Sequence, residues 1–332
     1  MRMHPSFSII IPVYNASSWI GDALNSILKQ DYREVEILCM DDASTDDSVQ
    51  AICLIAERDS RVRLFSSIRN EGAGARRNEG IQHARGEWIL FLDADDWYEE
   101  GLFLRLAGVI VRNPDINIIE FEFFITDPHG TKKRAEWLNR GEEGVKLVEK
   151  ENILSCTSTC NKCWRREFLV KWGLSFAVTN QSGEEVPLHI CAFLVAERFY
   201  YLPFKGYCWR YCPDSCSRSE KKETVFLEGI FDMLQVLRKE LVRLRLFHEE
   251  YYRLACLVIL SWSLQEKKSS RKTYGIYYRS VREWFLKNGI SRRVFNKYGY
   301  GGLYKCYKKL EKTPWPLFRI KMMLKYMLTI NK

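Results

Sequence analysis

The chain has 332 residues, of which 46% are hydrophobic and 28% charged, and this ordinary globular composition argues against a disordered or fibrous protein. No run reaches the roughly 18 uncharged apolar residues that a membrane-spanning helix needs. The N-terminus lacks the apolar core and cleavage site of a secretory signal. We therefore expect a cytoplasmic protein whose eleven cysteines are reduced.

The net charge of +9 is unevenly distributed. Residues 267–332 hold 18 basic and only 2 acidic side chains, interleaved with 13 aromatic ones. A basic and aromatic surface of this kind suits an anionic membrane, and we expect the C-terminal region to hold the protein on the inner face of the membrane. A merely solvated basic face and a nucleic-acid surface are the alternatives, and nucleic acid is the least favoured of the three.

Strand and helix patterns alternate through the first 125 residues. In chain order the sequence predicts a strand at 7–13, a helix at 19–30, a strand at 35–40, a helix at 46–57, a strand at 62–66, a helix at 73–84, a strand at 88–92, a helix at 102–111 and a strand at 116–124. This alternation predicts a mostly parallel sheet with helices on both faces. Ligands of such sheets bind at the carboxyl ends of the strands.

The pattern weakens after residue 126. A helix at 184–197 and a strand at 199–203 are predicted, and the chain reads as helical after about residue 222. We expect one domain over residues 1–220, made of two halves, residues 1–125 and 126–220. Residues 221–332 then form a helical, basic C-terminal region.

The strongest local signal is the acidic turn Asp93-Ala94-Asp95-Asp96, which directly follows an apolar strand. Hard cations such as Mg²⁺ or Mn²⁺ prefer carboxylate oxygens and keep open positions for phosphates. A solvated turn that caps the next helix is the alternative reading of the same residues.

Two further loops carry polar residues at the ends of predicted strands. The first is Met40-Asp41-Asp42-Ala43-Ser44-Thr45-Asp46, where Ser44 or Asp46 can cap a helix. The second runs from Asn70 to Gly80 and resembles a dinucleotide-binding fingerprint only weakly, because Arg77 stands where a third glycine is expected. An arginine at this place better suits the base or phosphates of a nucleotide.

Together these blocks resemble the family 2 glycosyltransferases of the GT-A fold, in family order and spacing over residues 7–97. The resembling blocks are Ser8-Ile9-Ile10-Ile11-Pro12-Val13-Tyr14-Asn15, Asp41 to Asp46, Asn70 to Gly80, and Phe91 to Asp96. A weaker resemblance continues at Asn161-Lys162 and Gly183-Glu184-Glu185 and reaches about residue 220.

The resemblance implies that residues 1–125 are the nucleotide-binding half and residues 126–220 the acceptor-side half of the domain. It also implies a role for each matching residue. Pro12 and Tyr14 line the base pocket, Asp42 contacts the base with Arg77 nearby, and Asp93 holds the ribose. Asp95, or alternatively Asp96, holds the Mg²⁺ or Mn²⁺ ion that bridges the diphosphate.

The same resemblance implies an inverting transfer, in which a general base deprotonates the acceptor hydroxyl. The family usually has Glu-Asp at the base position, whereas this chain has Glu184-Glu185. We expect Glu185 to be the base, with Glu184 as the alternative, because Glu185 stands where the family has its aspartate. The start of a helix also favours the ionised form that a base needs.

The sequence therefore predicts a metal-dependent inverting glycosyltransferase of cell-surface polysaccharide or lipopolysaccharide synthesis. Its expected donor is a nucleotide sugar, with UDP as the nucleotide, and its expected acceptor is a glycan or lipid-linked glycan. One alternative is a catalytically impaired protein that only binds a sugar nucleotide. A less favoured alternative is an iron–sulfur or zinc protein that uses Cys156, Cys160 and Cys163, whose spacing resembles a radical-SAM loop.

Overall fold

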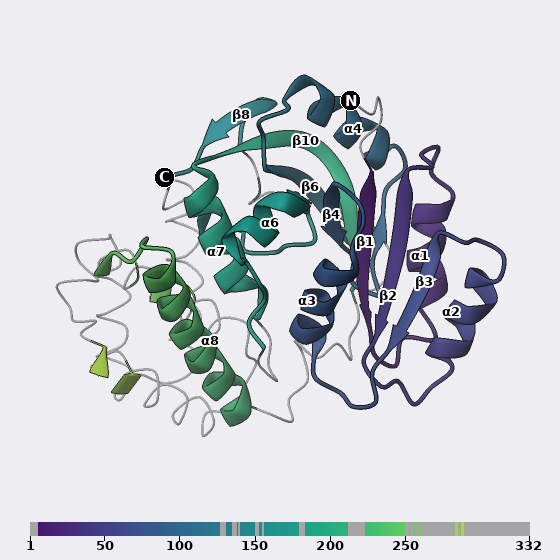
Figure 1. The fold of residues 1–332 in the computed structure, drawn as a ribbon, viewed down its shortest axis with the longest axis horizontal. Helices are drawn as coiled ribbons and strands as arrows, with labels where there is room; N and C mark the ends of the chain where they lie inside the picture. The colour runs from purple at the N-terminus through teal and green to yellow at the C-terminus, as the bar shows by residue number, and fades with distance from the viewer. Residues whose placement is uncertain are drawn as a thin grey trace. The chain divides into compact units, whose positions relative to one another are not determined.

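The computed structural model describes residues 6–126, 131–134, 138, 140–149, 153–154, 156–178, 183–211 and 223–249, with eight isolated positions between 252 and 288. The chain divides into two compact units, Met1–Ser219 with Gly229–Leu246, and Glu220–Glu228 with Phe247–Lys332. The architecture below is that of the first unit (Figure 1). The predicted basic tail falls almost wholly outside the described residues.

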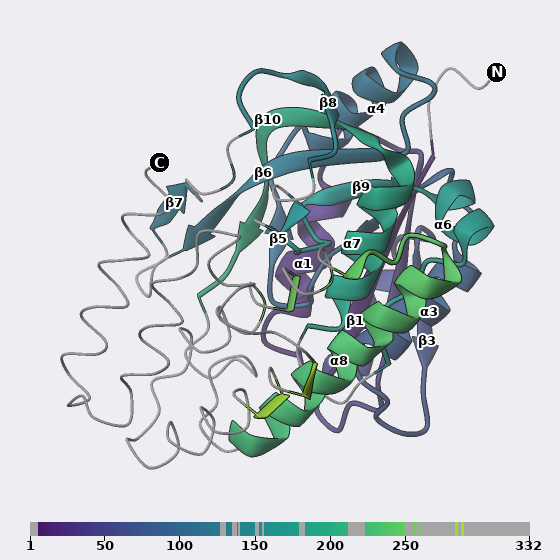
Figure 2. The same ribbon diagram turned by 90° about the vertical axis from the view of Figure 1, so that its left-hand side faces the viewer.

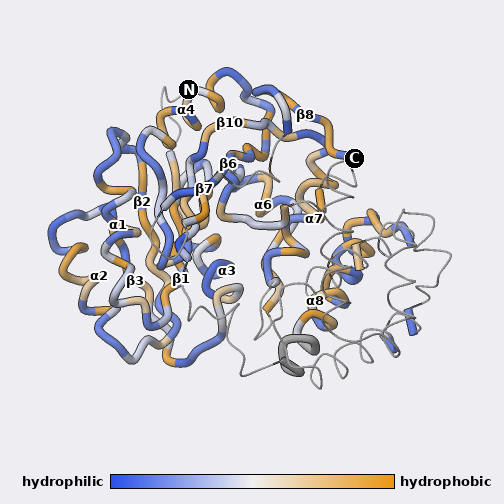
Figure 3. The backbone as a smooth tube through the Cα atoms, turned by 180° about the vertical axis from the view of Figure 1, so that it is seen from behind, coloured by the Kyte–Doolittle hydropathy of each residue, from blue (hydrophilic) through white to orange (hydrophobic). Residues whose placement is uncertain are grey.

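The first half of the unit forms the parallel part of a mixed sheet. Strand β1 lies between β2 and β4 with all three parallel, and β3 extends the sheet beyond β2. The bounds are β1 (Phe7–Val13), β2 (Val35–Asp41), β3 (Val62–Ser66) and β4 (Trp88–Phe91). Strands β1, β2 and β4 are almost wholly buried apolar runs, as expected of parallel strands covered on both faces. Figure 3 shows these hydrophobic stretches along β1 and β2.

The chain reverses its direction of travel across the sheet at β1, which makes a topological switch point. Helices α1 and α2 connect β1, β2 and β3 in one direction, whereas α3 carries the chain back past β1 to β4. Because such crossovers are right-handed, α3 covers the sheet face opposite to α1 and α2 (Figure 1). The bounds are α1 (Ile20–Leu28), α2 (Ser48–Ala56) and α3 (Ala73–His83).

The second half extends the sheet with strands of both directions. Strand β9 (Lys162–Arg165) is antiparallel to β4 and β6, and β6 (Ile118–Thr126) pairs in parallel with the long strand β10 (Arg198–Trp209) (Figure 2). The short strands β5 (Trp97–Tyr98), β7 (Lys132–Arg134) and β8 (Gly144–Leu147) pair with β10, β6 and β10 respectively. The remaining helices are α4 (Leu102–Arg112), α6 (Arg166–Trp172), α7 (Glu185–Ala196) and α8 (Glu223–Arg243).

A buried ionic cluster interrupts the apolar core of this second half. The Oε2 atom of Glu120 lies 2.9 Å from Nε of Arg140, and its Oε1 atom lies 3.3 Å from Nζ of Lys162. The hydroxyl of Tyr201 donates to Glu122 at 2.7 Å. Glu120 and Lys162 are fully buried, so each charge depends on the other for compensation. The charged residues Glu120 and Lys162 therefore interrupt the apolar pattern of β6 and β9.

In the part of the chain that the structure describes, no helix is both long and apolar enough to cross a membrane.

The contact between α3 and β1 can be tested with a matched pair of glycines. A Cβ atom on Gly80 would lie 2.4 Å from Cγ2 of Ile10, which is fully buried, whereas one on Gly21 of α1 would meet no atom within 4 Å. We expect Gly80→Ala to lower the free energy of unfolding by about 1–3 kcal/mol through overpacking. Gly21→Ala is the control and should leave it unchanged or raise it by up to about 1 kcal/mol. Denaturant unfolding measures both, and equal stability of the two variants would contradict this packing.

Candidate active site

The loops that follow β1 and β2 are joined by hydrogen bonds from side chain to backbone. Oδ1 of Asn15 accepts from the backbone N–H of Thr45 at 2.8 Å, and Oδ2 of Asp46 accepts from the N–H of Ser17 at 3.0 Å. Oδ1 of Asp46 accepts from the N–H of Ser48 at 3.0 Å. Although burial acts in the opposite direction, the hydrogen bonds from Ser48 and Ser17 lower the pKa of Asp46 to about 2. The two loops therefore form one rigid wall at the carboxyl edge of the sheet.

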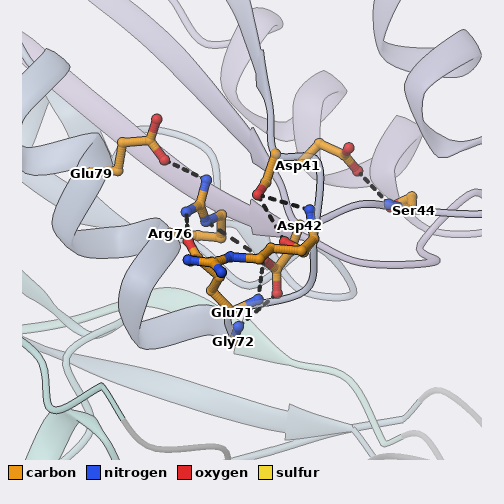
Figure 4. A network of polar contacts seen from close by, with 9 residues as sticks. Asp41, Asp42, Ser44, Glu71, Gly72, Arg76 and Glu79 are labelled. Atoms are coloured by element: carbon orange, nitrogen blue, oxygen red, sulfur yellow. Dashed lines mark hydrogen bonds and ion pairs between the residues drawn. The ribbon is translucent and has the colours of Figure 1, made fainter.

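The loop before α3 is held by Asp42, as Figure 4 shows. The two carboxylate oxygens of Asp42 accept from the backbone N–H groups of Glu71 and Gly72, each at 2.8 Å. Arg76 lies beside Asp42 and pairs with Glu71 at 2.6 Å and also with Glu79. Asp42 is buried, and its carboxylate fixes the conformation of the loop through these two hydrogen bonds. Asp42 lies at the edge where the sequence predicts it, whereas no pattern in the sequence indicates the role of Arg76.

Arg77 joins the acidic turn after β4 to the start of α7. One of its terminal nitrogens lies 2.6 Å from Oδ1 of Asp93 and the other 2.7 Å from Oε1 of Glu184. Its guanidinium also lies 5.2 Å from the centre of the Phe176 ring. Burial acts to lower the pKa of Arg77, but the charges of Asp93 and Glu184 outweigh burial and the net shift is upward. Arg77 is thus an ionic bridge between two acidic segments, and its predicted contact with the nucleotide stays a prediction.

The backbone of the segment before α7 packs closely against helix α3. A Cβ on Gly74 would lie 2.5 Å from the carbonyl oxygen of Ala177, so only glycine fits there. Asn78 donates to the carbonyl of Phe176 at 3.0 Å and accepts from its N–H at 2.8 Å. Ala177 in turn donates to the carbonyl of Glu184 at 2.9 Å. These contacts place the first turn of α7 beside the carboxyl ends of β1 and β4.

The three acids of the turn Asp93–Asp96 have different environments. Asp96 is buried, accepts from the hydroxyl of Tyr207, and accepts from the N–H of Arg210 at 2.7 Å. Burial, with the charges of Asp93 and Asp95, raises the pKa of Asp96 well above its ordinary value. Nε of Arg210 donates to the carbonyl of Asp95 at 2.7 Å. Asp93 and Asp95 are partly exposed at the edge of the sheet, so Asp96 shapes the turn while they face the site.

The two glutamates at the start of α7 differ in their partners. Glu184 forms the ion pair with Arg77, whereas Glu185 is half-buried and forms no ion pair with a described residue. Burial and the neighbouring charge of Glu184 raise the pKa of Glu185 to about 8. The expected effect of the helix start on ionisation is therefore outweighed. A carboxyl group with a pKa near the working pH has the acid–base balance that a general base needs.

Pro12 and Tyr14 lie at the carboxyl end of β1. Pro12 is in β1 opposite Met40 of β2, and the ring of Tyr14, just beyond the strand, is 52% exposed. The carbonyl of Val13, the residue before Tyr14, accepts from the N–H of Asp42 at 2.8 Å, so an exposed aromatic ring follows β1 close to the end of β2.

The iron–sulfur and zinc interpretation of the cysteines is wrong. Cys156, Cys160 and Cys163 are buried free thiols, and within the described ranges no group of three or more His, Cys, Asp or Glu side chains is placed to hold a metal ion. Cys160 lies near Asp93 and Arg77, whereas the charge next to Cys163 is that of Arg165. Cys160 and Cys163 therefore have different charged neighbours. Spacing along the chain suggested a cluster, but the turn into β9 separates them.

Comparison with known proteins agrees with the geometry. Residues 8–172 match glycosyl transferase family 2. An uncharacterized glycosyltransferase of Haemophilus influenzae is 44% identical over 161 residues, which are 45% of this chain and 64% of the relative. The crystal structure of Staphylococcus aureus TarS 1-349 with UDP-GlcNAc shares 21% identity and superposes with a TM-score of 0.60, covering 89% of this chain and 92% of that one.

A mannosyltransferase from Pyrobaculum calidifontis, PcManGT with GDP-Man and Mn²⁺, superposes with a TM-score of 0.51 at 16% identity, covering 96% of this chain and 85% of that one. Its fold, like that of TarS, is the fold of this chain: a mixed, mostly parallel α/β sheet of the GT-A type. Residues 8–172 of the protein are a glycosyl transferase family 2 domain. The chain spans less than two thirds of the length of the curated relatives that it matches first.

The raised pKa of Glu185 predicts a pH dependence of stability. Between about pH 4.5 and pH 8 the folded protein holds a proton on Glu185 that the unfolded chain has lost, so the free energy of unfolding falls as pH rises through this window. We expect the free energy of unfolding of Glu185→Gln to lack the decrease that Glu185 causes in this pH window. The variant should therefore be more stable than wild type at pH 9 by on the order of 1 kcal/mol or more. Denaturant unfolding from pH 5 to pH 9 measures the effect. Glu167→Gln, at an exposed position of α6, is the control, and parallel pH profiles for all three proteins would refute the assignment.

Proposed function

We propose that the protein is a metal-dependent inverting glycosyltransferase that transfers a sugar from a UDP-sugar to a glycan or lipid-linked acceptor in the synthesis of a cell-surface polysaccharide. The observation that carries the proposal is the bridge made by Arg77, which brings the carboxylates at the start of α7 alongside the acidic turn after β4. The edge of the sheet that is proposed to bind the donor and the candidate base therefore lie next to each other, at the switch point of the sheet.

The nucleotide is proposed to bind over the carboxyl ends of β1 and β2. Pro12 and the exposed ring of Tyr14 offer an apolar face to a base. Oδ1 of Asp42 accepts from the backbone and faces Arg76 at 3.5 Å, whereas Oδ2 accepts one backbone hydrogen bond and keeps the capacity for a second, with which Asp42 is proposed to contact the base. Asp93, held by Arg77, is proposed to accept from the ribose hydroxyls. The UDP-GlcNAc of the TarS structure supports uridine as the base.

The acidic turn fits a divalent cation. Mg²⁺ and Mn²⁺ sites in nucleotide enzymes commonly use one or two carboxylates together with substrate phosphates, and the partly exposed Asp95 supplies such an oxygen. Asp96, the alternative ligand, has both oxygens engaged by Tyr207 and Arg210. A bound cation neutralises the charge that develops on the leaving diphosphate. The Mn²⁺ in the PcManGT structure supports this choice of cofactor.

Glu185 is proposed to be the base of a direct displacement. As the acceptor oxygen attacks the anomeric carbon, its proton moves to the carboxylate of Glu185, and the bond from that carbon to the diphosphate breaks. The bond to the acceptor forms on the opposite face, so the configuration inverts. Glu184 serves as a positioning residue because its carboxylate is engaged by Arg77.

Asp95→Asn tests the cation site. We expect wild-type protein to gain melting temperature with UDP only when Mn²⁺ is present, by the equivalent of about 2.7 kcal/mol at 100 times the Kd. Asp95→Asn should lose this gain because a neutral amide is a poorer ligand for a hard cation. Asp47→Asn, an exposed change before α2, is the control. If Asp96→Asn loses the gain and Asp95→Asn keeps it, the two roles are exchanged.

Glu185→Gln tests the base. We expect it to retain the binding of UDP and Mn²⁺ but to release sugar from a panel of UDP-sugars roughly 100-fold more slowly or worse. Glu185→Asp keeps a carboxylate and should keep activity. In wild type kcat/KM should rise with pH towards a plateau above about pH 8, which is the pKa of Glu185 in the free protein. Glu167→Gln again serves as the control.

The outcomes separate this function from its alternative. An impaired protein that only binds sugar nucleotides would show Mn²⁺-dependent binding of UDP but no turnover in wild type. Normal turnover in both Glu184→Gln and Glu185→Gln would show that the base lies elsewhere.

A further inference from the structure

A groove of about 650 Å³ lies between α1 and β5, which are neighbours in the fold (Figure 2). Asp22 and Asn25 of α1 and Lys29, the residue directly after the helix, line it at spacings of three and four residues. Trp97 and Glu100 face them from β5 and the residues beyond it. Its volume is within the range of small-molecule sites. The donor residues proposed above do not line this groove.

The groove offers unused hydrogen-bonding groups. Asn25, Lys29 and Glu100 are exposed, and their side chains have no hydrogen-bond or ion-pair partner among the described residues. An amide, an ammonium and a carboxylate together both donate and accept hydrogen bonds. Such a set can bind a ligand rich in hydroxyl groups, each of which also donates and accepts.

The charges and the aromatic ring narrow the class of ligand. The two acids Asp22 and Glu100 are balanced by Lys29 and Arg210, so the lining has no net charge and gives no preference for an ionic ligand. The guanidinium of Arg210 lies 4.7 Å and Nζ of Lys132 lies 5.8 Å from the centre of the Trp97 ring, and the part of this ring that stays exposed can pack against C–H groups. Hydroxyl groups at the rim with C–H groups on the faces are the chemistry of a neutral saccharide.

One end of the groove reaches the acidic turn through Arg210. Its guanidinium donates to the carbonyl of Asp95 at 2.7 Å and pairs with Asp22 at 2.9 Å. The same guanidinium lies 4.7 Å from the centres of the Trp19 and Trp97 rings. A ligand in the groove therefore shares a wall with the turn to which the donor is proposed to bind.

We propose that this groove binds a neutral saccharide stretch of the acceptor glycan, away from the sugar that receives the transfer. That the saccharide belongs to the acceptor rests on the proposed transferase function. The groove's preference for neutral saccharide rests on its own lining.

The test uses protein labelled with ¹⁵N at tryptophan and three neutral trisaccharides, maltotriose, cellotriose and triacetylchitotriose. The indole signal of Trp97 is assigned with Trp97→Phe. We expect at least one trisaccharide to shift this signal at concentrations of about 10 mM or below. The variant Asn25→Ala/Glu100→Ala should bind that trisaccharide roughly tenfold or more weakly, and Gln50→Ala on α2 should bind it as wild type does.

Two results would overturn the proposal. The first is that none of the three trisaccharides shifts the Trp97 signal. The second is that the Asn25→Ala/Glu100→Ala variant, with an unchanged melting temperature, binds as tightly as wild type. The titration needs neither Mn²⁺ nor UDP, so its failure is distinct from a failure of donor binding, which is measured on the same variants by the Mn²⁺-dependent gain in melting temperature.

Discussion

The placement of Arg77 between Asp93 and Glu184 is the interaction on which the site depends. A buried guanidinium is costly unless its charge is compensated, and here two carboxylates on different segments provide the compensation. Because Asp93 follows β4 and Glu184 precedes α7, satisfying one charge fixes the relation between the two halves of the domain. Removing either carboxylate leaves a buried charge partly unpaired, so the pairing is strongly constrained.

The neighbouring contacts reinforce this arrangement. Gly74 lets the backbone before α7 approach α3 closely, and Asn78 forms a pair of hydrogen bonds with Phe176. These contacts fix position, whereas Arg77 adds the charge balance. Glu185, one residue beyond the pair, is left without an ion-pair partner in the described chain. Burial, together with the nearby negative charge of Glu184, keeps the pKa of Glu185 high, while the charge of Arg77 acts in the opposite direction. The bridge therefore helps to fix where Glu185 lies, whereas burial is the main reason for its raised pKa.

The first half of the domain could be predicted from sequence because each strand there is a continuous apolar run that ends at a polar loop. The predicted strands at 7–13 and 62–66 coincide with β1 and β3, and the other elements differ at their ends by one or two residues. The second half could not be predicted equally well. Strand β9 carries the buried Lys162, and its charge is tolerated only because Glu120 lies beside it on β6. The pairing of Arg77 with Glu184 joins residues 107 positions apart, which no local pattern reveals.

The joined loops after β1 and β2 have a consequence for ligand association. Asn15 and Ala43 adopt left-handed backbone conformations, with φ of 49° and 62°, which are unfavourable for residues with a Cβ atom and persist only where the surroundings impose them. Asn15 is fixed by its bond to Thr45, and the turn at Ala43 is closed by the bond from the Ser44 N–H to Asp41. The conformational entropy of this wall is therefore lost during folding rather than on encounter with a ligand. A molecule that binds there meets a preorganised surface, so less of its interaction energy is offset by the cost of ordering these loops and its affinity is higher.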